Sequence, residues 1–319
     1  MESEKKVNLS QSFKDKIDPK SQFLKKNIPG VKKIIAISSA KGGVGKSTIS
    51  ANLAVAAAKQ NFSIGLLDAD IYGPSIPDLF NISEKPSADQ NKKINPIIAQ
   101  NIKLISMGFL IDKNAPMIWR GPMVINAIKS FLNDVNWGEL DCLFVDLPPG
   151  TGDAILTFAQ ELKVDGSIII TTPQKLSITD ANRGIEMFKK THIPVLGIIE
   201  NMSYILDKNN KPSFPFGKDG AEELSKKQNV KLLDKIKIDE TFNHCVEKGV
   251  VFENLSDDPN QDIQIAQGRA VMMKDELIKL GLSEDRILGV FYNVPQESKG
   301  CVEIGCAKGR RVVINLFNK

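Results

Sequence analysis

The chain has 319 residues, of which 42 % are hydrophobic and 25 % are charged, and its net charge is +4. These proportions are near the globular average, so they exclude a disordered or fibrous chain. No apolar run reaches the roughly 18 residues of a membrane span, and the small net charge without a dominant basic face argues against nucleic acid as a partner.

Three segments follow one another along the chain. Residues 1–30 are polar and lysine-rich and lack the apolar stretch of a secretory signal, so we expect a flexible lead-in. Residues 31–282 carry the main domain. Residues 283–319 contain two strand-like runs, 287–294 and 311–317, and predict an extra C-terminal tail that could pair as a β-hairpin.

Short β-branched runs alternate with helical patterns through the main domain. We expect strands at residues 33–38, 63–67, 102–106, 142–145, 167–171 and 195–199, and helices at residues 47–60, 122–133, 153–162, 178–190 and 263–280. Continuous apolar strands separated by helices predict a doubly wound α/β fold with a mostly parallel sheet, covered on both faces. Such sheets bind ligands at the carboxyl ends of their strands.

The first predicted strand leads into a glycine-rich loop and then a helix, the context that a phosphate-binding loop needs. The loop reads SSAKGGVGKST at residues 38–48. Its glycines allow the backbone N–H groups to curl around phosphate oxygens, and the following helix points its positive end at the same anion. We assign nucleotide binding to Ala40, Lys41, Gly42, Gly43, Val44, Gly45, Lys46, Ser47 and Thr48. Ala40 stands where the general pattern has its first glycine.

Individual roles follow from the position of each side chain in this loop. We expect Lys46 to be catalytic by reaching the β- and γ-phosphates of ATP. Ser47 is the expected ligand of Mg²⁺, and Thr48 lies one step further, near the α-phosphate.

Acidic residues follow two other predicted strands. Asp146 ends one of these strands and opens the string DLPPGTGD at residues 146–153. In this position a Walker B aspartate holds the magnesium shell. Asp70 is placed to orient or deprotonate the attacking water, and Asp68 to support the metal shell. A strand-end aspartate is often only a turn cap, but two such loops in register with a phosphate-binding loop favour the catalytic interpretation.

Lys41 is a second lysine just before GGVGK, and it marks the deviant Walker A loop. At this point the sequence resembles the MinD/ParA/nitrogenase-iron-protein class of dimeric P-loop ATPases. The resemblance implies a homodimer in which Lys41 crosses to the partner's nucleotide and neutralises transition-state charge, as an arginine finger does elsewhere.

Four strings narrow the resemblance to one family: DADIYGPSIP at 68–77, WRGPM at 119–123, DLPPGTGD at 146–153 and ENMSY at 200–204. They are similar to the Mrp/ApbC-type iron–sulfur cluster carriers over about four-fifths of the chain. The family implies an ATP-hydrolysing homodimer that binds a [4Fe–4S] cluster and passes it to apoproteins. It also implies that Asn201 recognises adenine, which a side-chain amide can do; a turn residue at a strand end is the alternative interpretation.

The cysteines depart from this family. Its Cys-x-x-Cys follows the ENMSY string, but residues 205–217 contain no cysteine here, so the usual thiolate ligands are missing. Cys142 falls on a predicted buried strand, where a free cysteine is usually a small hydrophobe. Cys245 follows a lone histidine. Cys301 and Cys306, spaced x₄ in the tail, could bind a metal or cluster, or could be free thiols.

The sequence alone leaves two functions open. The first is the cluster carrier that the family implies, and the second is a cluster-free ATPase switch of the MinD/ParA class that acts through a protein partner. The strand-like tail argues against a membrane-binding amphipathic helix. Four cysteines in 319 residues are too few for a disulfide scaffold, so we expect a reducing, cytoplasmic location.

Overall fold

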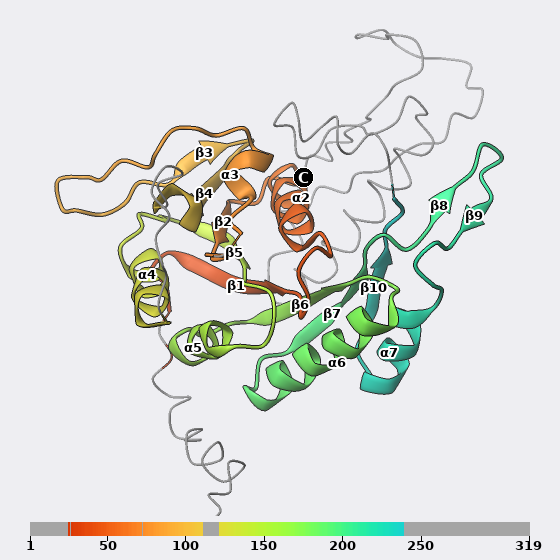
Figure 1. The fold of residues 1–319 in the computed structure, drawn as a ribbon. Coiled ribbons are helices and arrows are strands. Elements are labelled where there is room, and N and C mark those ends of the chain that lie inside the picture. The colour runs from red at the N-terminus through yellow and green to blue at the C-terminus, as the bar shows by residue number, and fades with distance from the viewer. Residues whose placement is uncertain (1–24, 26, 72, 111–120, 239–319) are drawn as a thin grey trace, which may run out of the picture.

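An eight-stranded sheet forms the centre of the residues described by this computed structural model, which are 25, 27–71, 73–110 and 121–238. The strand order is β10-β7-β6-β1-β5-β2-β4-β3, and every neighbouring pair is parallel except β3 with β4 (Figure 1). The strands are β1 (Val31–Ser38), β2 (Ile64–Asp68), β3 (Ile97–Ala99), β4 (Ile102–Ser106), β5 (Leu140–Asp146), β6 (Gly166–Thr171), β7 (Val195–Glu200) and β10 (Leu232–Lys235). The predicted doubly wound α/β fold with a mostly parallel sheet is confirmed.

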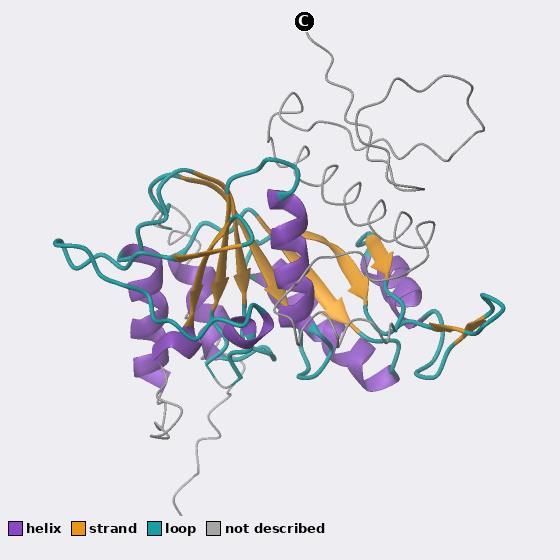
Figure 2. Ribbon diagram, turned by 90° about the horizontal axis from the view of Figure 1, so that it is seen from above, coloured by secondary structure: helices purple, strands orange, loops and turns teal. Residues whose placement is uncertain are grey.

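Helices cover both faces of this sheet (Figure 2). The helices are α2 (Lys46–Ala58), α3 (Ile76–Leu79), α4 (Gly121–Asn133), α5 (Asp153–Glu161), α6 (Lys175–Lys190), α7 (Gly220–Gln228) and the short 3₁₀ helix η2 (Met107–Leu110). Apolar residues of α4, α5, α6 and α7 join the core on one face, and those of α2 and α3 join the core on the other. The two cores account for the continuous apolar runs of the central strands.

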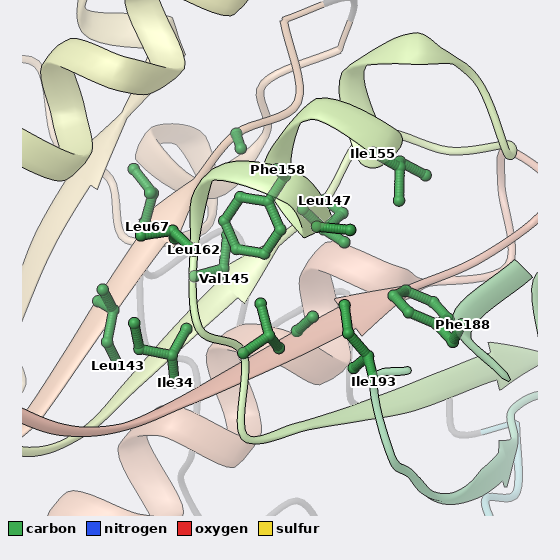
Figure 3. Packing of buried hydrophobic residues seen from close by; sticks show 14 of the residues in the cluster. Ile34, Leu67, Leu143, Val145, Leu147, Ile155, Phe158, Leu162, Phe188 and Ile193 are labelled. Atoms are coloured by element: carbon green, nitrogen blue, oxygen red, sulfur yellow. The ribbon is translucent and has the colours of Figure 1, made fainter. Parts of the chain in front are cut away.

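Packing is dense under the helices on the first face. Phe158 of α5 and Phe188 of α6 lie over strands that carry Ile34 and Val145, and all four side chains are buried (Figure 3). On the other face α2 is rich in alanine, so its backbone can approach the sheet closely, and nearly all of its residues are buried. A helix buried on most of its surface needs no polar face.

The six predicted strands and four of the five predicted helices are present, with ends that differ by at most three residues. The fifth helix, at 263–280, and the tail at 283–319 lie outside the described residues, as does most of the lead-in. Ile28, which falls in the predicted lead-in, is buried in the core that also contains side chains of β1. Among these elements, the sequence patterns did not predict β3, β10, α3, α7 or η2.

A hairpin of two short strands, β8 (Ile205–Leu206) and β9 (Pro212–Ser213), projects from the body after β7 (Figure 1). Its turn is organised by Asp207, whose Oδ1 accepts hydrogen bonds from the backbone N–H groups of Asn209 and Lys211 at 2.9 and 2.8 Å. This hairpin occupies the stretch where the resembled family has its Cys-x-x-Cys.

Strand order brings the predicted site residues together. β5 lies between β1 and β2, so Asp146 is the register partner of Ile37 on one side and of Asp68 on the other. Asp68 in turn is the register partner of Ser106 on β4. The carboxyl ends of four strands therefore meet next to the loop that connects β1 with α2.

Candidate nucleotide site

The loop between β1 and α2 has the backbone shape of an anion cradle. Gly43 and Gly45 adopt left-handed conformations, with φ of 79° and 82°, which L side chains rarely adopt. Helix α2 begins at Lys46, and no side chain caps its first turn in the described part of the chain. Unsatisfied N–H groups and the positive end of the helix are therefore available to a phosphate.

Lys46 is buried at the centre of the site, and only 6 % of its side chain is exposed. Its Nζ lies 2.8 Å from Oδ2 of Asp146, 3.3 Å from Oγ of Ser47 and 3.8 Å from Oδ2 of Asp70. The structure thus brings together the predicted phosphate lysine, the predicted magnesium serine and two of the predicted carboxylates. In this arrangement the ammonium is paired with the carboxylates.

Asp146 is fully buried and each of its oxygens has a donor. Lys46 donates to Oδ2, and the hydroxyl of Ser50, from the next turn of α2, donates to Oδ1 at 2.6 Å. The loop that follows is tied to the phosphate-binding loop by the N–H of Gly150, which donates to the carbonyl of Ser39 at 2.8 Å. A change at one loop can therefore reach the other through a direct contact.

Asp68 is also fully buried and supports the loop that carries Asp70. Its Oδ1 accepts the N–H of Asp70 at 3.1 Å, and its Oδ2 accepts the hydroxyl of Ser106 at 2.8 Å. The pKa of Asp68 is raised to about 7, mainly by burial and to a smaller extent by the charge of Asp146. The Ser106 hydroxyl, the charge of Lys46 and the Asp70 N–H act in the opposite direction. Among the described residues, three buried carboxyl groups, those of Asp68, Asp70 and Asp146, therefore surround one buried ammonium group, that of Lys46.

The donor set fits magnesium. Ser47 and Asp146 offer hard oxygen atoms that both contact the ammonium of Lys46, and Asp68 is the register partner of Asp146 on the neighbouring strand. No cluster of three or more His, Cys, Asp or Glu side chains suited to a metal occurs among the described residues. Magnesium usually takes only one or two protein carboxylates and completes its shell with water and phosphate oxygens, so this sparse set suits it.

Asp70 is buried beside Lys46, and its Oδ1 accepts the N–H of Gly73 at 3.2 Å. Lys41 is half-buried, and no side-chain ion pair is formed by its ammonium with the described residues. The two residues differ accordingly: Asp70 is held in the site, whereas Lys41 has no acidic partner within the described part of its own chain.

Asn201 reaches the phosphate-binding loop itself. Its Nδ2 donates to the carbonyl of Val44 at 2.9 Å, and a side chain at Gly45 would collide with it. The residue follows β7 and is held by its backbone N–H, which donates to Thr171 at 2.8 Å. Its expected contact with adenine stays a prediction, and its contact with the loop is an additional finding.

Of the cysteines, Cys142 alone falls within the described residues. It is fully buried on β5, as the sequence predicts. Burial raises the pKa of its thiol well above the usual value, and Asp165 and Asp141 act in the same direction. Cys245, Cys301 and Cys306 lie outside the described residues, so their predicted roles stay predictions.

Ser50 and Ser106 are site residues that the sequence patterns did not identify. Ser50 lies four residues after Lys46, so helical spacing alone would have placed both on one face of α2. Ser106 reaches Asp68 only through the pairing of β2 with β4, which no local pattern indicates.

Comparison with known proteins agrees with this geometry. The ParA family model, described as an NUBPL iron-transfer P-loop NTPase, matches residues 30–271. An Arabidopsis thaliana protein named "Iron-sulfur protein required for NADH dehydrogenase, mitochondrial" is 49 % identical over 223 residues, which are 69 % of this chain and 71 % of that protein. The Aquifex aeolicus "Iron-sulfur cluster carrier protein" is 44 % identical over 71 % of this chain, which spans 63 % of the length of that relative.

Solved structures agree as well. A nucleotide-binding protein from Archaeoglobus fulgidus, in complex with ADP, is 38 % identical with a TM-score of 0.63, covering 72 % of this chain and 92 % of that one. The cell division ATPase MinD of Pyrococcus furiosus, at 19 % identity and a TM-score of 0.54 over 78 % of this chain and 99 % of its own, shares the fold. With the family model matching three-quarters of its length, the chain belongs to the ParA/NUBPL iron-transfer family of P-loop NTPases.

Proposed function

We propose that this protein is an ATP-hydrolysing homodimeric carrier that binds iron–sulfur clusters and transfers them to apoproteins. The observation that carries the proposal is the phosphate-binding loop with Lys46 buried between Asp146 and Asp70, in a chain whose relatives are named iron–sulfur cluster carriers. The first feature supports nucleotide chemistry and the second supports the cargo.

In the nucleotide step, the loop N–H groups and the start of α2 bind the phosphates, and Lys46 exchanges its carboxylate partners for phosphate oxygens. Ser47 and Asp146 would hold magnesium, which neutralises charge on the phosphates when bound. Asp70, already buried beside Lys46, orients the attacking water. Because Asp68 fixes the N–H of Asp70, it keeps this carboxylate in position.

Dimerisation completes the site. In the described part of its own chain Lys41 has no carboxylate partner, and its side chain is half-buried in the phosphate-binding loop. We assign it to the nucleotide of the partner subunit, where its charge stabilises the transition state. Hydrolysis then loosens the contact and moves the loops after Asp70 and Asp146.

The hydrolysis step is tested by Lys41→Ala and Asp70→Ala in the full chain. Each variant should lose ATP turnover and retain binding of a fluorescent ATP analogue, because neither residue forms the phosphate cradle alone. Lys163→Ala, an exposed lysine beyond α5 at the opposite end of the sheet, is the matched control and should keep turnover. Unchanged turnover in either test variant would contradict the mechanism.

The cargo site is a separate question. Cys142 is buried in the core with a raised pKa, so it cannot present a thiolate to a cluster. Residues 205–217 provide no cysteine. We therefore propose Cys301 and Cys306 as the ligands, since a dimer would bring together four thiolates, the number that a [4Fe–4S] cluster takes.

Anaerobic reconstitution with iron and sulfide tests this assignment. The wild-type chain should gain the visible absorption of a cluster, and the Cys301→Ser/Cys306→Ser variant should lose it, while Cys142→Ser keeps it. No absorption in the wild type would exclude cluster binding by the homodimer alone. ATP turnover measured on the same samples separates failure of the cargo site from failure of the nucleotide site.

A second function is supported by the hairpin β8–β9. Where the resembled family has cysteines, this chain has a turn organised by Asp207, and a carboxylate is a poor ligand for a cluster that prefers thiolates. A cluster-free ATPase switch that acts through a protein partner is the alternative, and it predicts ATP turnover without cluster absorption.

The proposed compartment is the cytoplasm, on the basis of the low cysteine content. Within the residues that the structure describes, none of the helices has the length and apolar character required to cross a membrane.

A further inference from the structure

Ser50 lies inside the nucleotide site without belonging to the phosphate-binding motif. It is fully buried near the start of α2, and its Oγ lies 2.6 Å from Oδ1 of Asp146 and 3.0 Å from the carbonyl oxygen of Lys46. A hydroxyl carries one proton, and a carboxylate is a stronger acceptor than a carbonyl. The shorter contact, with Asp146, therefore takes the proton.

The two oxygens of Asp146 are thus held by two different donors on one helix. Ser50 holds Oδ1, and Lys46 holds Oδ2 at 2.8 Å. Nucleotide binding requires Lys46 to leave Asp146 for the phosphates. Once it does so, Ser50 is the side-chain donor that this buried carboxylate retains within the described part of the chain.

We propose that Ser50 is a positioning residue that fixes the rotation of the Asp146 carboxylate, so that Oδ2 keeps facing the place now taken by the ammonium of Lys46 and stays available to the magnesium shell. This inference rests on the proposed Mg-ATP function. Without the hydroxyl, Oδ1 would be a buried charged acceptor with no side-chain donor from the described residues, and the carboxylate could turn about its Cβ–Cγ bond to find one.

The geometry also explains why a serine suits this position. The carbonyl of Lys46 is a second acceptor within reach. If Asp146 shifts during the nucleotide cycle, the hydroxyl can donate to this carbonyl and stays satisfied, so Ser50 does not oppose the movement. Ser50 therefore orients the Asp146 carboxylate in the arrangement seen here and still allows it to shift during the nucleotide cycle.

The test is the affinity of the full chain for a fluorescent ADP analogue, measured once in EDTA and once in excess magnesium. Ser50→Ala should weaken binding about tenfold in magnesium, the loss expected for one hydrogen bond to a charged group, and leave binding in EDTA near the wild-type value. Ser50→Thr keeps the hydroxyl and should restore the magnesium effect. A purely structural role would change both affinities together.

Two controls define the result. Ser167 is also fully buried, and it donates to the carbonyl of Pro194 at the opposite end of the sheet, so Ser167→Ala should leave the magnesium effect intact. In an Asp146→Asn background Ser50→Ala should have no further effect, since the serine acts through that carboxylate. If the alanine variant does not fold, Ser50→Cys keeps the volume with a weaker donor.

The outcomes separate this inference from the proposed function. A wild-type chain that binds no nucleotide overturns both. A wild-type chain that gains affinity with magnesium, together with a Ser50→Ala variant that gains it equally, overturns the role of Ser50 and leaves the nucleotide function standing.

Discussion

Acidic side chains at the two ends of the parallel sheet have different numbers of cationic partners; those at the amino ends are buried (Asp141) or half-buried (Asp165). At the amino ends, Asp141 pairs with Lys32 at 2.7 Å and accepts the N–H of Ser63 at 2.9 Å. Asp165 pairs with Lys33 at 3.2 Å and accepts a backbone N–H at 2.9 Å. Each carboxylate there has its own lysine, and both lysines are partly exposed.

At the carboxyl ends the balance of charge is different. Lys46 lies within 4 Å of both Asp146 and Asp70, and Asp68 lies beside Asp146 in register. Among the described residues, three buried carboxyl groups therefore share Lys46 at the carboxyl ends, whereas each aspartate at the amino ends has its own lysine. We expect a bound cation to balance the carboxyl ends further.

Replacing Lys46 at the carboxyl ends should cost much more free energy of unfolding than replacing a lysine at the amino ends, and this is the largest expected effect. Lys46→Met removes the cation that pairs with the fully buried carboxylate of Asp146, so the free energy of unfolding without nucleotide should fall by about 3 kcal/mol. Lys32→Met removes a lysine whose side chain is 51 % exposed, and it should cost less than about 1 kcal/mol. Urea unfolding of both variants checks this, and equal losses would contradict the comparison.

Most of this site could be predicted from the sequence, because its parts are local. The strand, loop and helix around Lys46 form a contiguous motif, and Asp68 and Asp146 end recognisable apolar runs. The contact of Asn201 with Val44 joins residues 157 positions apart, and the bond between Ser106 and Asp68 depends on strand pairing. Such contacts arise from tertiary packing, which local patterns do not encode.

The pH dependence of stability should differ between the ends as well. The pKa of Asp68 is about 7 in the folded chain, above the ordinary value of 3.8 that an aspartate has in an unfolded chain, so the folded state binds the extra proton. Its contribution therefore destabilises the fold progressively as the pH rises from about 4 to about 7. Asp68→Asn should remove this slope, so that the variant gains stability relative to the wild type between pH 5 and pH 8.

Thermal unfolding without nucleotide at several pH values measures this effect. Asp141→Asn is the matched control at the amino end, because it removes the partner of Lys32 and should lose stability at pH 8. A gain at pH 8 for both variants would mean that the carboxylates at the two ends are equivalent.

The smallest expected effect concerns one glycine at each end. Gly30 and Gly45 have φ of 79° and 82°, so alanine at either position costs about 1 kcal/mol in backbone strain. A methyl group at Gly30 would also meet the backbone of Gly138, whereas at Gly45 it would meet the side chain of Asn201, which can move. Gly30→Ala should therefore lose more stability, and Gly45→Ala should lose more nucleotide affinity. Unfolding and nucleotide titration of the same two variants measure the loss of stability and the loss of affinity. A larger loss of stability in Gly45→Ala than in Gly30→Ala would show that the contact between Asn201 and the loop is rigid.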